Sequence, residues 1–209
     1  MYKHLYDNFK HWYRGGTVYF YSDPHFADDE MKYIRKNYIG DDEQVRAINK
    51  KIGKKDTIVF LGDIGDVEFI SKIRGYKILV MGNHDSGASN YIRAIEYWWN
   101  WHNDVSYDLV PHDNHLFDEV YEGPLCISEK IILSHEPLDI PFMLNIHGHD
   151  HSGWTFQDIN HWNVCAENIG YTPVCIKEIV NSGRLNKIDS IHRITIDTAT
   201  ERKKVRGKI

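Results

Sequence analysis

Three short apolar runs dominate the first part of the chain. Residues Thr17–Tyr21, Thr57–Leu61 and Tyr76–Met81 are rich in β-branched and aromatic side chains, as buried strands are. Between them, Asp41–Ile52 opens with acids and closes with lysines, which favours a helix, and Val67–Ile73 is also expected to be helical. This β-α-β-α-β order predicts parallel strands with helices packed outside them. Active groups in such sheets lie beyond the carboxyl ends of the strands.

The second part of the chain has a different pattern of apolar and polar residues. Short strand-like runs separated by turn residues suggest a second, more antiparallel sheet packed on the first. These runs are Phe117–Tyr121, Leu125–Ile127, Ile131–Leu133, Asn145–His147 and His161–Cys165. Residues Val174–Val180 are expected to form a helix, whereas Ile191–Thr200 fits either a strand or a helix.

Size and composition indicate one globular domain spanning residues 1–209. The 209 residues are 42% hydrophobic and 13% aromatic, enough to bury a substantial core. Residues 86–116 match no motif and are predicted to form a helical or loop insertion. Three tryptophans in this stretch, Trp98, Trp99 and Trp101, are more typical of a core than of a substrate shelf.

Charge and cysteine content narrow the range of partners and compartments. A formal net charge of -5 argues against a broad basic surface for nucleic acid. The basic end, Arg202–Ile209, is expected to be a solvated tail, with contact to an anionic ligand or partner as the alternative. Three cysteines without CxxC spacing indicate buried thiols in a reducing compartment. Without an apolar leader or membrane span, we expect a soluble cytoplasmic protein with no membrane partner.

Polar side chains follow the apolar runs at regular spacings. Asp23 and His25 stand two residues apart just after a predicted strand, so in extended backbone they point to the same side. His149 and His151 repeat this spacing. A lone Asp-x-His pair is usually structural, but repeated pairs behind strands indicate that several side chains reach one cation.

Three further residues extend this set of ligand types. Asp63 follows Gly62, which permits a tight turn, and its two oxygens are able to bridge two ions. Asn83 offers a neutral oxygen and His135 an imidazole. Nitrogen and oxygen ligands without sulfur suit Mn, Fe, Zn or Ni better than Ca. Seven ligands are about right for two ions sharing one aspartate, namely Asp23, His25, Asp63, Asn83, His135, His149 and His151.

These blocks, in this order, resemble the calcineurin-like metallophosphoesterases. The matching blocks are Asp23-Pro24-His25, Gly62-Asp63 with Asp66, Gly82-Asn83-His84-Asp85, His135 and Gly148-His149-Asp150-His151. The resemblance covers about Thr17 to Glu178. Residues 163–167 and 171–174 look like those of the small bacterial and phage members. Phe26-Ala27-Asp28 stands where many of those members carry a Gly-His pair.

The resemblance implies a fold, a ligand set and roles. The implied fold is α/β, a four-layer α/β/β/α sandwich. The first metal would be held by Asp23, His25, Asp63 and His151, and the second metal by Asp63, Asn83, His135 and His149. Asn83 and His84 would contact the substrate phosphate. His84 would be catalytic, with Asp85 accepting a hydrogen bond from its ring and orienting it.

The function expected from the sequence is that of a dinuclear metal-dependent phosphoesterase. The expected cofactors are two divalent ions, Mn first, with Fe, Zn or Ni as alternatives. Their charge of +4 exceeds the -2 of the two aspartates, so the site attracts phosphoryl oxygens. Attack by a metal-bridging hydroxide would hydrolyse phosphomonoesters or phosphodiesters, with a small phosphoester or nucleotide as substrate. The alternatives are a nuclease of the same superfamily, which the net charge disfavours, and a non-catalytic binding module, which usually loses ligands that this chain retains.

Overall fold

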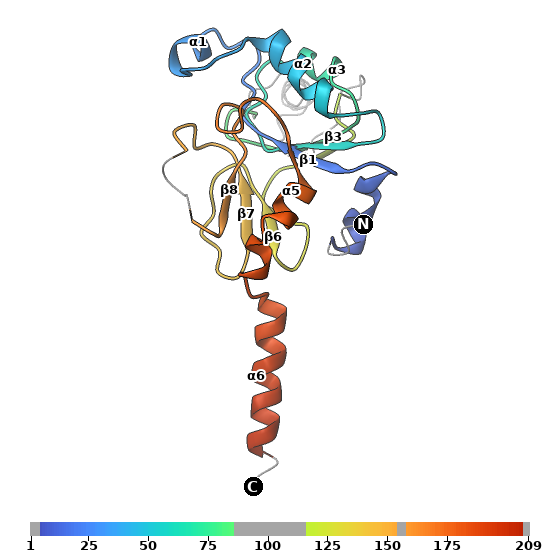
Figure 1. Cartoon of the computed structure of the whole chain (residues 1–209), viewed down its shortest axis with the longest axis vertical. Helices are drawn as coiled ribbons and strands as arrows, with labels where there is room; N and C mark the ends of the chain where they lie inside the picture. Colours follow the sequence, from blue (N-terminus) through green and yellow to red (C-terminus); the bar gives the residue numbers. More distant parts are fainter. Residues whose placement is uncertain (1–4, 86–115, 154–157, 207–209) are drawn as a thin grey trace, which may run out of the picture.

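The computed structural model describes residues 5–85, 116–153 and 158–206. These residues form a mixed α/β fold with two sheets, one in the order β4-β3-β2-β1-β9 and the other β5-β6-β7-β8 (Figure 1). The strands are β1 (Val18–Tyr21), β2 (Thr57–Phe60), β3 (Tyr76–Val80), β4 (Glu119–Tyr121), β5 (Leu125–Cys126), β6 (Ile131–Leu133), β7 (Leu144–His147), β8 (His161–Asn163) and β9 (Val174–Cys175). The helices are η1 (Asp7–Tyr13), α1 (Met31–Ile34), α2 (Asp41–Lys51), α3 (Glu68–Ser71), α5 (Ile176–Asn181), η3 (Arg184–Asn186) and α6 (Ile191–Arg206). The α/β prediction is confirmed.

The first sheet follows the β-α-β-α-β prediction closely. Strands β1, β2 and β3 pair in parallel, with α2 and α3 in the crossovers between them. Strand β4 also joins this sheet, parallel to β3, although the sequence placed Phe117–Tyr121 in the second sheet. That prediction was wrong because the composition of a strand indicates its extended backbone but not its pairing partner.

The second sheet is mostly parallel, so the prediction of a more antiparallel sheet was wrong. Strands β6–β7 and β7–β8 pair in parallel, and β5–β6 is antiparallel. The connections 134–143 and 148–160 are long enough to cross over, whereas antiparallel neighbours need only tight turns. The expected helix at 174–180 also starts later, because Val174–Cys175 pairs with β1 before α5 begins. The ambiguous segment at 191–200 lies in α6.

The two faces of the first sheet pack against different layers. Val59 of β2 joins the core between the sheets, which includes Leu133 and Ile146 of the second sheet. Its neighbours Ile58 and Phe60 point the other way and join the core under α2 and α3. This burial on both faces explains why β2 reads as a continuous apolar run. Helices, first sheet and second sheet thus stack in that order, while the fourth layer of the predicted sandwich stays a prediction.

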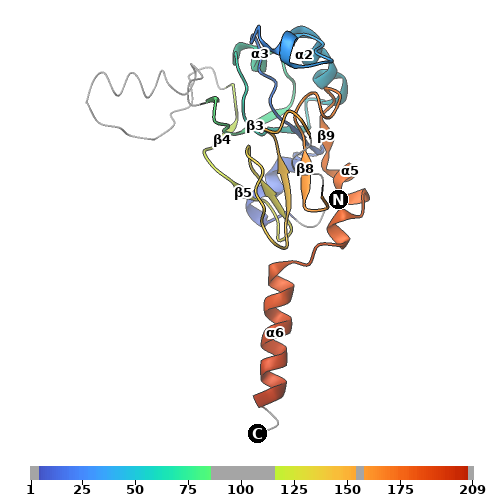
Figure 2. The same ribbon diagram turned by 90° about the vertical axis from the view of Figure 1, so that its left-hand side faces the viewer.

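The end of the chain leaves the two-sheet body. Figures 1 and 2 show α6 projecting from the body, and Arg193, Ile196 and Asp197 along it are exposed. Within the described ranges, no helix has both the length and the apolar character needed to cross a membrane. The predicted insertion at 86–116 lies outside these ranges except for its last residue, so the extent of a single domain and the role of its tryptophans stay predictions.

Candidate metal centre

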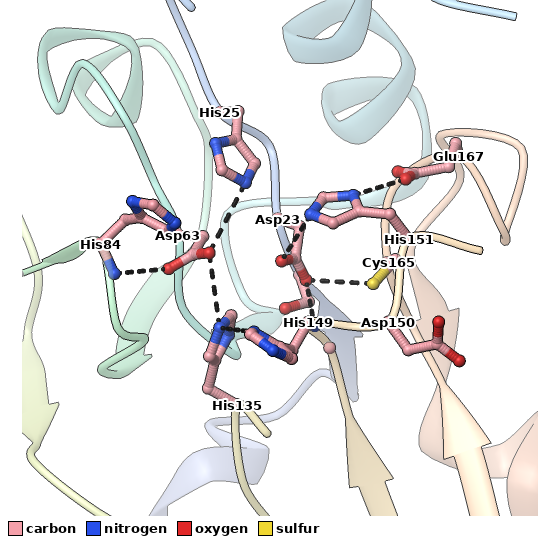
Figure 3. Close-up of polar contacts among 12 residues, drawn as sticks. Asp23, His25, Asp63, His84, His135, His149, Asp150, His151, Cys165 and Glu167 are labelled. Atoms are coloured by element: carbon pink, nitrogen blue, oxygen red, sulfur yellow. Dashed lines mark hydrogen bonds and ion pairs between the residues drawn. The ribbon is translucent and has the colours of Figure 1, made fainter. Parts of the chain in front are cut away.

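The predicted site residues meet where strands from both sheets end. Asp23 follows β1, Asp63 follows β2, His84 follows β3 and His135 follows β6. The turn after β7 adds residues 148–151. Figure 3 shows these side chains converging from opposite sides, with Asp63 between His25 and His135. Each strand is short and buried at its carboxyl end, so this end fixes where the following polar side chain lies.

Asp63 connects two groups of possible ligands. Its Oδ2 lies 3.6 Å from His25 Nε2 and 3.4 Å from His135 Nε2. Asp63 therefore belongs to one group with Asp23 and His25, and to another with His135 and His149. In each group the ligand atoms lie within 4.8 Å of one another. One buried carboxylate thus faces two positions where a cation fits.

Asn83, His135 and His149 form a tight triangle beside Asp63. His135 Nε2 lies 2.8 Å from Asn83 Oδ1 and 3.1 Å from His149 Nδ1, and the His149–Asn83 separation is also 3.1 Å. Ligand atoms bound to one ion at about 2.1 Å lie roughly 3.0–3.4 Å apart. The spacing of the triangle is therefore close to that of a coordination shell.

Asp23 is the centre of the other side. His151 Nε2 lies 3.5 Å from its Oδ1, while the His149 backbone N–H donates to its Oδ2 at 3.0 Å. The thiol of Cys165 also donates to Oδ2, at 3.2 Å, and forms a further possible ligand group with Asp23 and His151. Burial, and then the charge of Asp23, raises the pKa of the Cys165 thiol far above its usual range. The sequence interpretation treated Cys165 only as a buried thiol.

Two buried atoms of this centre suit a cation. Asp23 Oδ1 and His25 Nε2 have no hydrogen-bond partner within the described parts of the chain. Buried polar atoms are almost always paired, so two such atoms in one ligand group are best explained by a shared metal ion. The donor set and its spacing fit a metal ion, and these clusters fit a metal-dependent hydrolase.

The backbone is strained at the same residues. Within the described ranges, eight non-glycine residues have positive φ, and four of them are Asp23 (54°), His25 (46°), Asp63 (52°) and His149 (63°). Left-handed backbone costs an ordinary residue of order 1–3 kcal/mol. Strain concentrated on predicted ligands favours a functional explanation over a structural one.

Two glycines allow the loops to come close enough. A Cβ on Gly148 would fall on the Ser22 hydroxyl and the Asp23 carboxylate, and one on Gly62 would lie 2.5 Å from His135 Nδ1. Gly62 also has a φ of +88°, which side chains rarely adopt. Larger residues at these positions would push Asp23 and His135 out of their groups.

The carboxylates shift the titration of the histidines around them. Burial alone would lower the pKa of His135, but the hydrogen bond and charge of Asp63, with the charge of Asp23, raise it to about 9. Burial would raise the pKa of Asp63, yet His135 and the His84 N–H hold it below its usual value. At His25, burial prevails and lowers the pKa. The field that retains a proton on His135 would equally retain a metal ion.

His84 and Asp85 differ in position from each other. The His84 side chain is exposed, its N–H donates to Asp63 Oδ1 at 3.0 Å, and its ring lies 5.7 Å from the His25 ring. Asp85 is fully buried and accepts the backbone N–H groups of Asp63, Ile64 and Gly82 at 2.7–3.0 Å. The predicted hydrogen bond from the His84 ring to Asp85 is not among these contacts, because both Asp85 oxygens face backbone amides. The geometry favours a positioning role for Asp85.

Two charged residues beside the centre were missed by the sequence interpretation. Glu167 Oε1 lies 2.6 Å from His151 Nδ1, and Arg35 Nε lies 3.4 Å from Glu167 Oε2. Burial would lower the pKa of His151, but the hydrogen bond to Glu167 raises it. Glu167 lies in a stretch that carried the family resemblance, which was the available signal. Arg35 lies in no matched block.

Comparisons with known proteins support the fold alone. No family model and no curated protein matches this sequence. A protein of unknown function from Aquifex aeolicus is similar in structure, with a TM-score of 0.57 and 24% identity over 79% of this chain and 98% of the other. The nuclease MPE of Pseudomonas putida aligns with a TM-score of 0.41 and 15% identity over 67% of this chain and 64% of the nuclease. The first likeness supports the α/β fold, and inferences about chemistry rest on the residues of this chain.

Proposed function

We propose that this protein is a dinuclear metal-dependent phosphoesterase that hydrolyses phosphomonoesters or phosphodiesters. The observation that carries the proposal is the place of Asp63 in two ligand groups. A single carboxylate shared in this way suits a pair of divalent ions, the arrangement that phosphatases and nucleases use. The resemblance of the sequence blocks to calcineurin-like metallophosphoesterases supports the same conclusion.

The residues would divide between two metal positions. The first would be held by Asp23, His25, Asp63 and His151, and the second by Asp63, Asn83, His135 and His149. Ions bound there supply positive charge for phosphoryl oxygens and make water more acidic. Nitrogen and oxygen donors suit Mn²⁺, Fe, Zn²⁺ or Ni²⁺, and Mn²⁺ is the first choice for assay.

His84 is the residue proposed to act on the substrate. Its backbone is tied to Asp63 while its imidazole is exposed and close to the His25 ring. From there the imidazole can donate to a phosphoryl oxygen or protonate the departing oxygen. Asn83 would hold the phosphate beside it. Asp85 would position both residues through the backbone of their turn.

A cavity next to the second metal position offers room for the ester group. It measures about 270 Å³ and is lined by Asn83, His135, Leu138 and the carboxylate residues Glu122 and Glu136, among others. Both glutamates are exposed. Their charge would repel a polyanion, so the cavity supports a small phosphoester or nucleotide over a long nucleic acid.

A substrate panel tests the proposal. Phosphomonoesters, phosphodiesters, cyclic nucleotides and single-stranded DNA would be assayed with Mn²⁺, after chelation, and after Mn²⁺ is restored. We expect hydrolysis of small esters that is lost on chelation and recovered with metal. Faster cleavage of DNA than of every small ester would favour the nuclease alternative. Metal binding without any hydrolysis would favour the binding module.

A further inference from the structure

A buried chain of charges lies behind His151. His151 Nδ1 is 2.6 Å from Glu167 Oε1, and the other Glu167 oxygen is 3.4 Å from Arg35 Nε. The Arg35 side chain is 1% exposed and that of Glu167 is 14% exposed. Figure 3 shows Glu167 on the far side of His151 from Asp23. Surface ion pairs contribute little, but this one is enclosed.

Arg35 also holds the backbone of the first candidate ligand. Its Nη2 donates to the carbonyl oxygen of Asp23 at 2.6 Å, and its Nη1 donates to that of Pro24 at 3.4 Å. Asp23 has a left-handed backbone, so its conformation needs support from outside the loop. One guanidinium therefore supports both the Asp23 loop and the carboxylate that contacts His151.

The hydrogen bond to Glu167 determines which nitrogen of His151 is available. An ionised carboxylate only accepts hydrogen bonds, so Nδ1 carries the hydrogen. Nε2 is then free to bind a cation, and it faces Asp23 Oδ1 at 3.5 Å. Partners of this kind orient a ligating histidine and make it more basic.

Two other histidines of the centre, His135 and His25, have no equivalent support in the described contacts. His135 Nδ1 contacts a neutral partner, the Leu61 carbonyl oxygen, at 2.8 Å. His25 Nδ1 is 3.6 Å from Asp28 Oδ2, beyond hydrogen-bond distance. The close carboxylate contact at Nδ1 therefore distinguishes His151 from these two histidines.

We infer that Glu167 and Arg35 are positioning residues that set metal affinity at the Asp23–His151 position and leave the Asp63–His135–His149 position unaffected. Glu167 orients His151, and Arg35 holds Glu167 and the Asp23 backbone in register. The inference rests on the two-metal site of the proposed function. A purely structural role would instead lower stability and weaken both positions together.

Calorimetric titration of the metal-free protein with Mn²⁺ tests this directly. In Glu167→Gln we expect one of two binding steps to weaken by about 10–100-fold and the other to stay within about twofold. His149→Ala identifies the unaffected step by removing it. The control is Glu178→Gln, the same change at an exposed glutamate that pairs with Lys51 outside the centre. The melting temperature of metal-free Glu167→Gln should stay close to that of wild type.

Arg35→Lys supplies a second variant. It keeps a positive charge near Glu167 but loses the forked contacts with the Asp23 and Pro24 carbonyl oxygens. We expect the same step to weaken, by less than in Glu167→Gln. If Arg35→Lys binds Mn²⁺ with the same affinities as the wild type, Arg35 does not help to set metal affinity.

Other outcomes separate this inference from the proposed function. Equal weakening of both steps in Glu167→Gln, or no change in either, would overturn the positioning role. A wild-type protein that binds two Mn²⁺ ions yet hydrolyses no ester would overturn the phosphoesterase proposal and leave the positioning role standing. A wild-type protein that binds no metal would end both.

Discussion

The two sides of the candidate centre are held in different ways. On the Asp63 side, the turn carrying Asn83 and His84 is fixed by neutral backbone amides that donate to Asp85, and it ends in exposed side chains. On the Asp23 side, the candidate ligands are backed by the buried guanidinium of Arg35 and the partly buried carboxylate of Glu167. Under the proposed function, this difference would suit separate tasks. Each side would hold a metal ion, and the exposed side chains of the Asp63 side would in addition meet the substrate.

Asp63→Asn should have the largest effect because it breaks both sides at once. It removes a negative charge from both ligand groups, so we expect loss of bound metal and a fall in kcat/KM of more than about 10³-fold, beyond the 10–100-fold typical of residues behind the ligands. Metal content and activity would be measured together, with far-UV circular dichroism to verify the fold. The control is Asp158→Asn, since Asp158 pairs with His161 outside the centre. Near-normal metal content and activity would end the dinuclear proposal.

His84→Ala should separate chemistry from metal binding on the Asp63 side. Both metals should remain, and kcat should fall by about 10²–10⁴-fold if His84 protonates the leaving oxygen. The loss should be greater for an alkyl ester than for p-nitrophenyl phosphate, whose leaving group needs no proton. Equal losses would leave His84 only an electrostatic role, and full activity would remove it from the site. His11→Ala, at a histidine that pairs with Glu119, is the control.

Asp85→Asn should loosen the exposed turn without replacing any proposed metal ligand. In the wild type, backbone N–H groups donate to both Asp85 oxygens. In the variant, the side-chain NH₂ group would face one of these N–H donors, and the lost hydrogen bond would cost about 1–3 kcal/mol of stability. Burial raises the pKa of Asp85, so removing its charge recovers part of that cost. We expect a lower melting temperature and a roughly 10–100-fold lower kcat. Unchanged kcat with reduced stability would show that the turn does not set the position of His84.

A change of one pH unit should have the smallest effect, and it should act mainly on the Asp63 side. The pKa of His135 is about 9, so at lower pH a metal ion must displace a proton from this imidazole in order to bind. Apparent Mn²⁺ affinity there should rise about tenfold per pH unit between roughly 7 and 9 and then level off. The stability of the metal-free protein should instead fall as the pH rises. The raised pKa of His135 stabilises the folded state fully below about pH 6.5, and this contribution is lost as the pH rises through about 9. Competition with a chelating dye and thermal melts would measure both trends, and flat profiles would contradict them.

The sequence alone determined three strands of the first sheet and the positions of two candidate ligands at their ends. Strands β1 and β2 are almost entirely buried, and β3 ends in the buried run Ile78–Val80, so the ends of all three strands were easy to locate. Asp23 and Asp63 stand just beyond those ends, and in a parallel sheet those ends meet at one edge. Local pattern was sufficient because position along a strand also determines position in space.

Tertiary structure decided which distant groups complete the centre. Arg35 follows a short helix and Glu167 follows β8, and no period in the sequence links either one to Asp23 or His151. For the same reason, the sequence analysis assigned β4 to the wrong sheet and predicted the wrong strand pairing in the second sheet. The side-chain period of a strand indicates which face is buried, and it does not indicate which strand lies beside it. Asp85 was read as a partner of its neighbour His84. In the fold its oxygens accept backbone amides of the Asp63 loop, since a buried carboxylate must find donors wherever the packed chain provides them.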